Sequence, residues 1–253
     1  MIALSVNLNK IALIRNSRDT ANPDVPLHAQ MCIDAGANGI TVHPRPDQRH
    51  IRARDCFDLA QMLSVEFNIE GNPFSGPRKS ERAGVGDYPG FMELVRAVRP
   101  AQCTLVPDTE QQLTSDHGFD LRRDGERIAP ILAELRALGI RSSLFMDPDP
   151  AQMPLAAQAG ADRVELYTET YARACEKREN VEAVFGRFVE AAQAATRAGL
   201  GINAGHDLDL HNLPRFATLP GLLEVSIGHA LTVDAIRLGL AAAIKAYQRA
   251  LSS

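Results

Sequence analysis

A repeated local pattern constrains the fold of this chain more than any other feature. A helix-like segment ends at a glycine and a short apolar segment follows, in residues 34–43 (DAGANGITVH), 137–147 (ALGIRSSLFMD), 158–167 (QAGADRVELY) and 197–206 (RAGLGINAGH). Glycine permits the left-handed backbone that ends many helices. A short, continuous apolar run is typical of a strand that is buried on both faces. The pattern therefore predicts helices that alternate with buried parallel strands.

The same pattern, extended along the chain, predicts eight strands. They lie at about 2–8, 39–44, 66–71, 102–107, 141–147, 163–168, 200–205 and 222–228. Helical periodicity covers 127–138, 181–198 and 233–253, and 168–180 predicts an additional helical turn. Eight strand–helix units in 253 residues favour a closed (β/α)8 TIM barrel with extra helices, in the α/β class. An open doubly wound sheet is the alternative, but no Gly-x-Gly-x-x-Gly motif follows the first strand.

The chain is expected to form a single domain over residues 1–253 with one insertion loop. That loop, at about 71–89 (GNPFSGPRKSERAGVGDYP), is dense in Gly, Pro, Ser and charged residues, which is typical of a segment with little apolar surface to bury. Elsewhere no linker and no low-complexity tract divides the chain.

Composition excludes several functional classes. The net charge of −4 argues against a broad nucleic-acid surface. No apolar run approaches the roughly 20 residues of a membrane span, and the first residues, MIALSVNLNK, predict a strand and not a signal peptide. The four cysteines lie far apart without a Cys-x-x-Cys motif, which fits reduced thiols in a cytoplasmic protein and no structural zinc: Cys32, Cys56, Cys103 and Cys175.

Polar residues gather where the predicted strands end. In a TIM barrel the active site lies at the carboxyl ends of the strands, so these residues are expected to share one site. Unpaired carboxylates and imidazoles there have no packing role, so a catalytic site explains them better than structural side chains do. The residues at the predicted strand ends, with the glycine that precedes the last histidine, are Asn7, Asn9, Lys10, His43, Arg45, Glu70, Glu165, Asn203, His206, Asp207, Gly228 and His229.

These residue types indicate proton transfer on phosphorylated substrates. His and Glu in a partly desolvated site can move protons near neutral pH. Gly205-His206-Asp207 and Gly228-His229 follow strands seven and eight, where barrels often bind phosphate. Arg45 and His50, with Arg18 nearby, indicate a second anion site, because guanidinium groups match phosphate oxygens.

Metal and Schiff-base chemistry are less favoured. His43 and His50 lack the spacing of the common metal motifs. A protein imine would need a buried lysine at a strand end, and of four lysines only Lys10 lies near one.

With these residues assembled, the chain resembles the PdxJ family of pyridoxine 5′-phosphate synthases. The resemblance covers nearly the whole chain in consistent order. It rests on the segments SVNLNKIALIRNSR, GITVHPRPDQRHIR, FNIEGN, LVPDTEQQLTSDHGFD, RVELYTETYA, GINAGHDL and EVSIGHA.

The resemblance implies a (β/α)8 barrel with extra helices, assembled as a homo-octamer, without metal or redox cofactor. It also implies condensation of 1-deoxy-D-xylulose 5-phosphate with 3-amino-2-oxopropyl phosphate to pyridoxine 5′-phosphate, phosphate and water. It makes His43 and Glu70 proton acceptors, His206 a proton donor and Glu165 a transition-state stabiliser. It assigns Asn7, Arg18, Asp207, Gly228 and His229 to the aminoketone phosphate, and Arg45, His50 and Thr114 to the deoxyxylulose phosphate.

The chain departs from the family pattern in three places. Asn9-Lys10 stands where many members carry Asp-His, Asp207 stands where a Gly is frequent, and the 71–89 loop is longer than in the shorter members. Two other functions remain open at this point. One is a sugar-phosphate aldolase or isomerase that acts on a single substrate, and the other is a binder of phosphorylated metabolites without catalysis.

Overall fold

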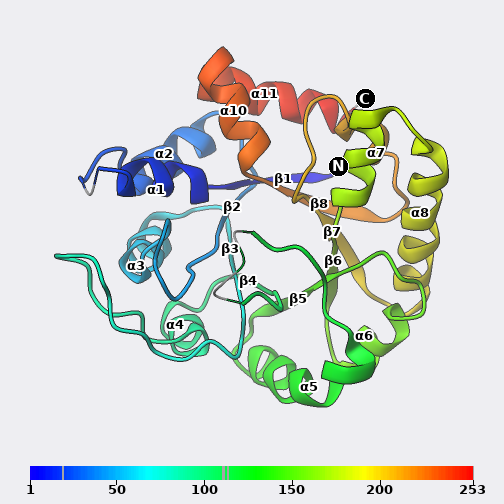
Figure 1. Cartoon of the computed structure of the whole chain (residues 1–253), viewed down its shortest axis with the longest axis horizontal. Coiled ribbons are helices and arrows are strands. Elements are labelled where there is room, and N and C mark those ends of the chain that lie inside the picture. Colours follow the sequence, from blue (N-terminus) through cyan, green and yellow to red (C-terminus); the bar gives the residue numbers. More distant parts are fainter. Residues whose placement is uncertain (19, 110–111, 113, 253) are drawn as a thin grey trace.

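The eight predicted strands form one closed parallel barrel (Figure 1). The computed structural model describes every residue except 19, 110–111, 113 and 253. Each strand pairs with its neighbour in sequence, and β8 closes the barrel against β1. The strands are β1 (Ala3–Asn7), β2 (Gly39–Val42), β3 (Glu66–Gly71), β4 (Gln102–Leu105), β5 (Arg141–Met146), β6 (Arg163–Leu166), β7 (Gly201–Ala204) and β8 (Leu222–Ile227).

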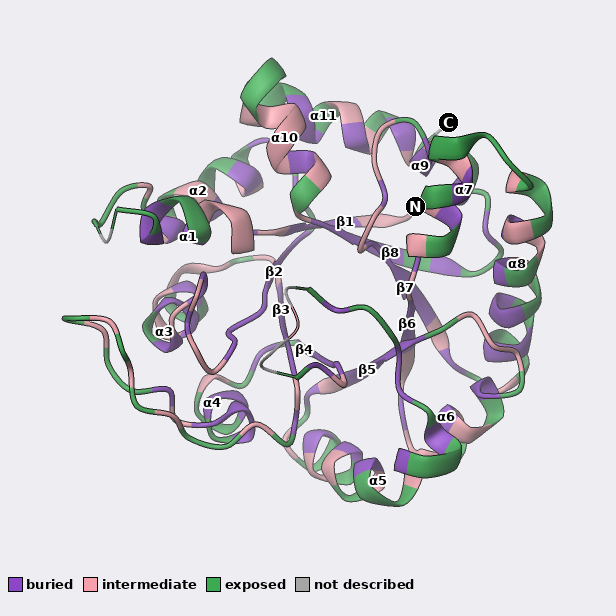
Figure 2. Cartoon of the chain, viewed as in Figure 1, coloured by how far each residue is buried: buried purple, intermediate pink, exposed green. Residues whose placement is uncertain are grey.

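Helices surround the barrel and turn their apolar faces toward it, so that buried residues lie inside and exposed residues outside (Figure 2). The fold predicted from the sequence is confirmed, and each strand lies within two residues of its expected bounds. The helices are α1 (Asn9–Asn16), α2 (Val25–Asp34), α3 (Ala53–Met62), α4 (Phe91–Val98), α5 (Leu121–Ala137), α6 (Met153–Ala159), α7 (Glu169–Lys177), α8 (Val181–Arg197), α9 (Leu213–Phe216), α10 (His229–Leu238) and α11 (Leu240–Ala250).

The four glycines of the repeated pattern end helices as expected. Gly36, Gly139, Gly160 and Gly199 follow α2, α5, α6 and α8 with φ values of +105°, +73°, +100° and +80°. A side chain is strained in this region of backbone space, whereas glycine is not. The chain therefore reverses direction after each helix and enters the next strand within a few residues.

The helical pattern over 233–253 covers two helices and not one. Two helices occupy this region, because Gly239 adopts φ +81° and ψ +147° and interrupts the helix between α10 and α11. The apolar periodicity continues across the glycine, so the pattern alone gave no sign of the break. After it, α11 contacts α2 and buries Ile244 and Tyr247.

The interior of the barrel is polar beneath the rim where the strands end. In the middle of the barrel, Ser5 Oγ lies 2.7 Å from Thr41 Oγ1, and Thr104 Oγ1 donates to Asn68 Oδ1 at 3.2 Å. Near the amino-terminal ends of the strands, Arg163 donates to Asn203 at 3.0 Å and to Glu224 at 3.1 Å. Burial, with the neighbouring Glu66 next, raises the pKa of Glu224 to about 7.

The segment 72–90 runs from β3 to α4 without a helix or strand of its own. Arg78 and Tyr88 form an isolated antiparallel bridge within it. Tyr88 is fully buried, and Gln48 Nε2 donates to the carbonyl of Gly86 at 2.8 Å. Residues 86–88 of this segment are therefore held against the barrel, and the segment forms part of the wall of a pocket described below.

In the part of the chain that the structure describes, no helix combines the length and apolarity needed to cross a bilayer.

Candidate active site

A central cavity of about 340 Å³ lies at the carboxyl ends of the strands. Of the residues to which the family resemblance assigns a role, all but one line it: Asn7, His43, Arg45, His50, Glu70, Thr114, Glu165, His206, Asp207, Gly228 and His229. Arg18 is the exception, since it is exposed after α1 and does not line the cavity. Asn9, Lys10, Ser115 and Ser226 complete the wall. Asn203, predicted at a strand end, instead bonds to Gln102 and Arg163 inside the barrel.

A chain of hydrogen bonds from the end of β1 connects the side chains of three strands. Asn7 Nδ2 donates to Glu70 Oε2 at 3.3 Å, and Asn7 Oδ1 accepts from the backbone N–H of Asn9 at 3.0 Å. Asn9 Oδ1 in turn accepts from the backbone N–H of His43 at 2.9 Å. Asn7 and Asn9 therefore fix the positions of Glu70 and His43 relative to each other.

His43 is an uncharged imidazole between two carboxylates. Its Nδ1 lies 3.9 Å from Glu70 Oε2 and its Nε2 lies 3.5 Å from Asp108 Oδ2. Burial lowers the pKa of His43 well below its usual range, and Arg45 adds to the effect. A neutral imidazole has a free lone pair, so His43 is able to accept a proton.

Asp108 is the functional side chain that the sequence analysis missed. It is buried three residues after β4 and forms an ion pair with Arg45. Ser115 Oγ also donates to its Oδ2 at 3.1 Å, and Arg45 Nη1 donates to the carbonyl of Gln112 at 3.0 Å. The rule that found the other residues also applies to Asp108, because VPD directly follows β4.

His50 has a tautomer set by the backbone. The N–H of Ile51 donates to His50 Nδ1 at 2.9 Å, so the proton of the neutral ring is at Nε2. Burial lowers the pKa of His50 well below its usual range, with His43 as the next cause. His50 therefore offers the cavity an N–H donor that carries no charge.

Two glutamates in the wall have raised pKa values. Burial raises the pKa of Glu70 well above its usual range, and the nearby Glu165 adds to the shift. Burial also raises the pKa of Glu165 to about 7, against the opposing effect of His206. The Glu165 carboxyl can therefore hold or release a proton near neutral pH, as an acid–base catalyst must, and Glu70 keeps its proton to a higher pH than an ordinary carboxyl group does.

His206 is contacted at both ring nitrogens and by two aromatic rings. Its Nδ1 lies 2.8 Å from Asp207 Oδ2 and its Nε2 lies 2.8 Å from Thr114 Oγ1. The rings of Tyr167 and Phe145 contact the imidazole edge-on, with centroids 5.4 and 6.1 Å away. This ring is therefore held in one orientation in the cavity.

Two glycines let the backbone of the last two strands come close to neighbouring strands. A Cβ on Gly205 would lie 1.9 Å from the carbonyl oxygen of Ser226, and one on Gly228 would lie 3.0 Å from Cβ of Asn7. Gly228 also directly precedes α10, whose first residue is His229. The unpaired N–H groups of a helix start favour anions, so this part of the wall is suited to a phosphate.

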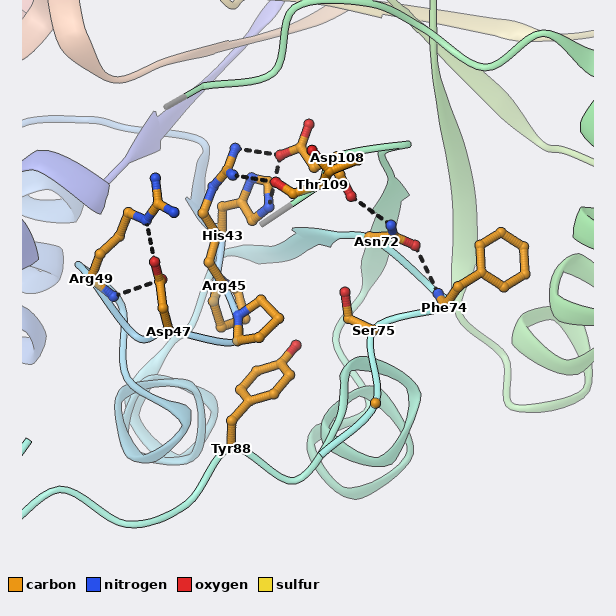
Figure 3. Close-up of a pocket in the computed structure, with 13 residues that line it drawn as sticks. His43, Arg45, Asp47, Arg49, Asn72, Phe74, Ser75, Tyr88, Asp108 and Thr109 are labelled. Carbon is orange, nitrogen blue, oxygen red and sulfur yellow. Dashed lines mark hydrogen bonds and ion pairs between the residues drawn. The ribbon is translucent and has the colours of Figure 1, made fainter. Parts of the chain in front are cut away.

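A second hollow, the outer pocket, adjoins the central cavity and measures about 260 Å³. Figure 3 shows its side chains: the Arg45 guanidinium is directed at Asp108, and the hydroxyl of Tyr88 points up from below. His43 and Arg45 line both hollows. Because Arg45 pairs with Asp108 and Arg49 with Asp47, the charges of the outer pocket are balanced within its own wall.

No group of three or more His, Cys, Asp or Glu side chains is arranged to hold a metal ion among the described residues. The acid–base groups of the cavity and the anion-binding groups beside them are the candidates for its chemistry.

Comparison with known proteins decides the family. Residues 4–253 match the family model described as pyridoxal phosphate biosynthesis protein PdxJ. The chain belongs to the PdxJ family. Relatives named pyridoxine 5′-phosphate synthase confirm the resemblance in the motifs. One from Xanthomonas campestris pv. campestris is 56% identical over 96% of this chain and 94% of its own length, and one from Albidiferax ferrireducens is 50% identical over 98% and 97%.

Solved structures support the barrel fold of this PdxJ family member. A 3-hexulose-6-phosphate synthase from Salmonella typhimurium aligns with a TM-score of 0.62 at 16% identity, over 99% of each chain. Tryptophan synthase from M. tuberculosis aligns with a TM-score of 0.60 at 12% identity, over 99% of this chain and 92% of its own. At these identities the likeness concerns the fold alone.

The buried Glu165 carboxylate predicts a pH-dependent cost in stability. Its pKa is about 7 in the folded protein against 4.5 as the ordinary value, so the native state binds more protons than the unfolded state between these limits. Stability therefore falls as pH rises from 4.5 to 7. In Glu165→Gln this loss is absent, and we expect the free energy of unfolding of the variant to exceed that of wild type by up to about 3 kcal/mol above pH 7.

Urea unfolding at a series of pH values checks this prediction. The difference between Glu165→Gln and wild type should be small near pH 4.5 and should grow up to pH 7. Glu190→Gln on the exposed face of α8 removes the same charge and should show no such growth. A constant difference across the pH range would contradict the burial effect at Glu165.

Proposed function

We propose that this PdxJ protein is a pyridoxine 5′-phosphate synthase. It condenses 1-deoxy-D-xylulose 5-phosphate with 3-amino-2-oxopropyl phosphate to pyridoxine 5′-phosphate, phosphate and water. One observation supports this most directly: four acid–base side chains and two sets of anion-binding groups line one cavity. The acid–base side chains are His43, Glu70, Glu165 and His206.

The deoxyxylulose phosphate is assigned to Arg45, His50 and Thr114. Arg45 is held in place by Asp108 and the Gln112 carbonyl, so its guanidinium needs no reordering on binding. His50 offers its Nε2–H without charge, since its Nδ1 already accepts from the backbone. The positive charge of Arg45 and the hydrogen-bond donors of His50 and Thr114 are suited to binding a phosphate group.

The aminoketone phosphate is assigned to the start of α10, where Gly228 and His229 lie next to Asn7. The resemblance adds the backbone N–H of Asp207, which in this structure donates to Thr168 Oγ1 at 3.3 Å. It also adds Arg18, which is exposed and does not line its own chain's cavity. A contribution from the Arg18 of a neighbouring subunit fits both facts.

The chemistry needs proton acceptors, a donor and a stabilising carboxylate. The amine of the aminoketone condenses with the pentulose ketone with loss of water, phosphate is eliminated, and ring closure with loss of a second water gives the aromatic pyridine. The neutral imidazole of His43 and the carboxylate form of Glu70 accept protons, His206 donates one, and Glu165 stabilises the transition state. The formation of the aromatic ring makes the last reaction steps favourable. The enzyme therefore mainly has to orient the substrates and transfer protons.

Turnover of EDTA-treated protein with both substrates tests the function. We expect phosphate and the pyridine chromophore in equal amounts, with neither substrate sufficient alone. Turnover of one substrate alone would instead identify an aldolase or isomerase. Tight binding without turnover would identify a metabolite binder.

Glu70→Gln should separate binding from catalysis. Gln is isosteric and can keep a hydrogen bond to Asn7, so the Kd for deoxyxylulose phosphate should change little. The amide does not accept the proton, so kcat should fall by on the order of 10² or more. Calorimetry and steady-state kinetics measure the two effects, with Glu190→Gln as the charge-matched control. Equal rates for wild type and Glu70→Gln would remove Glu70 from the mechanism.

We further propose that the chain acts as one domain, residues 1–253, within a homo-octamer in the cytoplasm. Its four cysteines are free, as in a reducing compartment. Exposed apolar side chains lie on neighbouring helices α1, α2 and α10 (Figures 1 and 2). Such a patch is typical of a subunit interface. Its members are Leu13, Ile14, Leu27, Met31, Ile236 and Leu238.

Ile236→Asp tests the assembly, since Ile236 is 79% exposed and its replacement should leave the barrel folded. Light scattering coupled to size exclusion should show smaller assemblies than for wild type. Circular dichroism should show an unchanged helix content. Assemblies of unchanged mass would place the interface elsewhere.

A further inference from the structure

The carboxylate of Asp207 has a different environment from the other loop carboxylate, Asp209. Asp209 Oδ1 accepts from the backbone N–H groups of His211 and Asn212 at 2.8 and 2.9 Å, which stabilises the turn before α9. Asp207 Oδ2 instead lies 2.8 Å from Nδ1 of His206, and no backbone N–H among the described residues donates to its side chain. Turn formation therefore accounts for Asp209 and leaves Asp207 without a purely structural reason.

We propose that Asp207 is a positioning residue for the proton donor His206. Its carboxylate accepts the Nδ1–H of the imidazole in both charge states of the ring, so that protons leave and return only at Nε2. This inference rests on the proposed function, since it concerns the same proton transfer. A carboxylate partner at one ring nitrogen fixes the tautomer and directs the other nitrogen to the chemistry.

The transfer balances at His206 without any further group. The imidazolium holds a proton on each nitrogen, with Nδ1–H directed at Asp207 Oδ2. When a substrate oxygen leaves, the Nε2–H bond breaks and an O–H bond forms. The ring becomes neutral and keeps Nδ1–H, and its Nε2 lone pair then accepts a hydrogen bond from the hydroxyl group of Thr114, 2.8 Å away. Asp207 stays ionised throughout.

The backbone of Asp207 is held at both of its hydrogen-bonding groups. Its N–H donates to Oγ1 of the buried Thr168 at 3.3 Å, and its carbonyl accepts from Nδ2 of the buried Asn212 at 3.2 Å. The hydroxyl of Tyr171, on α7, donates to the Asn212 carbonyl at 2.9 Å. These contacts place the carboxylate beside the imidazole before substrate arrives, so the pair needs no reordering during the reaction.

The first test measures the tautomer of His206 directly and needs no turnover. In protein labelled with ¹⁵N-histidine and kept in alkaline buffer, where imidazoles are neutral, the nitrogen shifts separate protonated from unprotonated Nδ1. The chain has seven histidines, and loss of one ring's signals in His206→Gln assigns the resonances.

We expect wild-type His206 to carry its proton on Nδ1. In Asp207→Ala and Asp207→Asn we expect a shift toward the Nε2–H tautomer. Asn is included because it fills the same volume, so the test survives if the smaller residue disturbs the loop. A wild-type Nε2–H tautomer, or variant spectra identical to wild type, would overturn the proposal.

The second test is a split between kcat and KM. The substrate contact assigned to residue 207 is its backbone N–H, which Asn and Ala retain, so KM for both substrates should stay within about threefold. Loss of an orienting partner typically costs 10- to 100-fold, and we expect kcat to fall about tenfold or more. Asp58→Asn, on the surface of α3, changes the net charge equally and should keep wild-type kcat.

The outcomes distinguish this proposal from the proposed function. An inactive wild type with a Nδ1–H tautomer that depends on Asp207 would contradict the synthase and leave the pairing in place. An active wild type with unchanged kcat in Asp207→Asn and Asp207→Ala would contradict the positioning role alone. A rise in KM with unchanged kcat would also overturn it, because it would make Asp207 a binding residue.

Discussion

Eight parallel strands that close on themselves must all end at the same rim, and the rest of this molecule depends on that constraint. It brings Asn7 of β1 and Ser226 of β8, at opposite ends of the chain, into one wall. It also places the polar barrel interior directly beneath the cavity. Hydrogen-bonded polar side chains therefore lie beneath the rim and support the side chains there. This rigidity suits a site whose proton transfers require fixed distances.

Burial at that rim sets the protonation of the site more strongly than any single charge does. Desolvation is the first cause of the lowered pKa values of His43 and His50 and of the raised pKa values of Glu70 and Glu165. Both effects favour uncharged groups. In the proposed reaction, phosphorylated substrates therefore meet glutamates that are readily neutralised by protons, which reduces repulsion, while the neutral imidazoles are able to accept protons. The same desolvation lowers the stability of the fold when Glu165 is ionised. Placing a carboxyl group here therefore costs stability, as is frequent at functional sites.

The fold was predictable because its signals are local. Glycine at a helix end and a short apolar run both lie within about ten residues, and the positive φ of Gly36 and its three counterparts follows from them. The strand-end rule then brought the site residues together without knowledge of any contact. What it could not supply were interactions between distant segments. The Arg45–Asp108 pair joins the loop after β2 to the loop after β4, and only the fold shows that Asp108 faces Arg45. At Gly239 a local signal was not sufficient: the apolar periodicity continues on both sides of the glycine, so the periodicity gave no sign of the break between α10 and α11.

Asn9 explains how the chain can depart from the family pattern at its first strand and still hold its site together. The position supplies an acceptor for the backbone N–H of His43 and a donor to Asn7, and Asn7 holds Glu70. The donor to Asn7 is the backbone N–H, and the acceptor is a side-chain oxygen that an amide provides without charge. The wall around it already contains Glu70, Glu165 and Asp207, with Asp108 behind His43. Another carboxylate at position 9 would raise the pKa of Glu70 further, whereas the amide keeps the geometry and adds no negative charge beside Glu70 and His43.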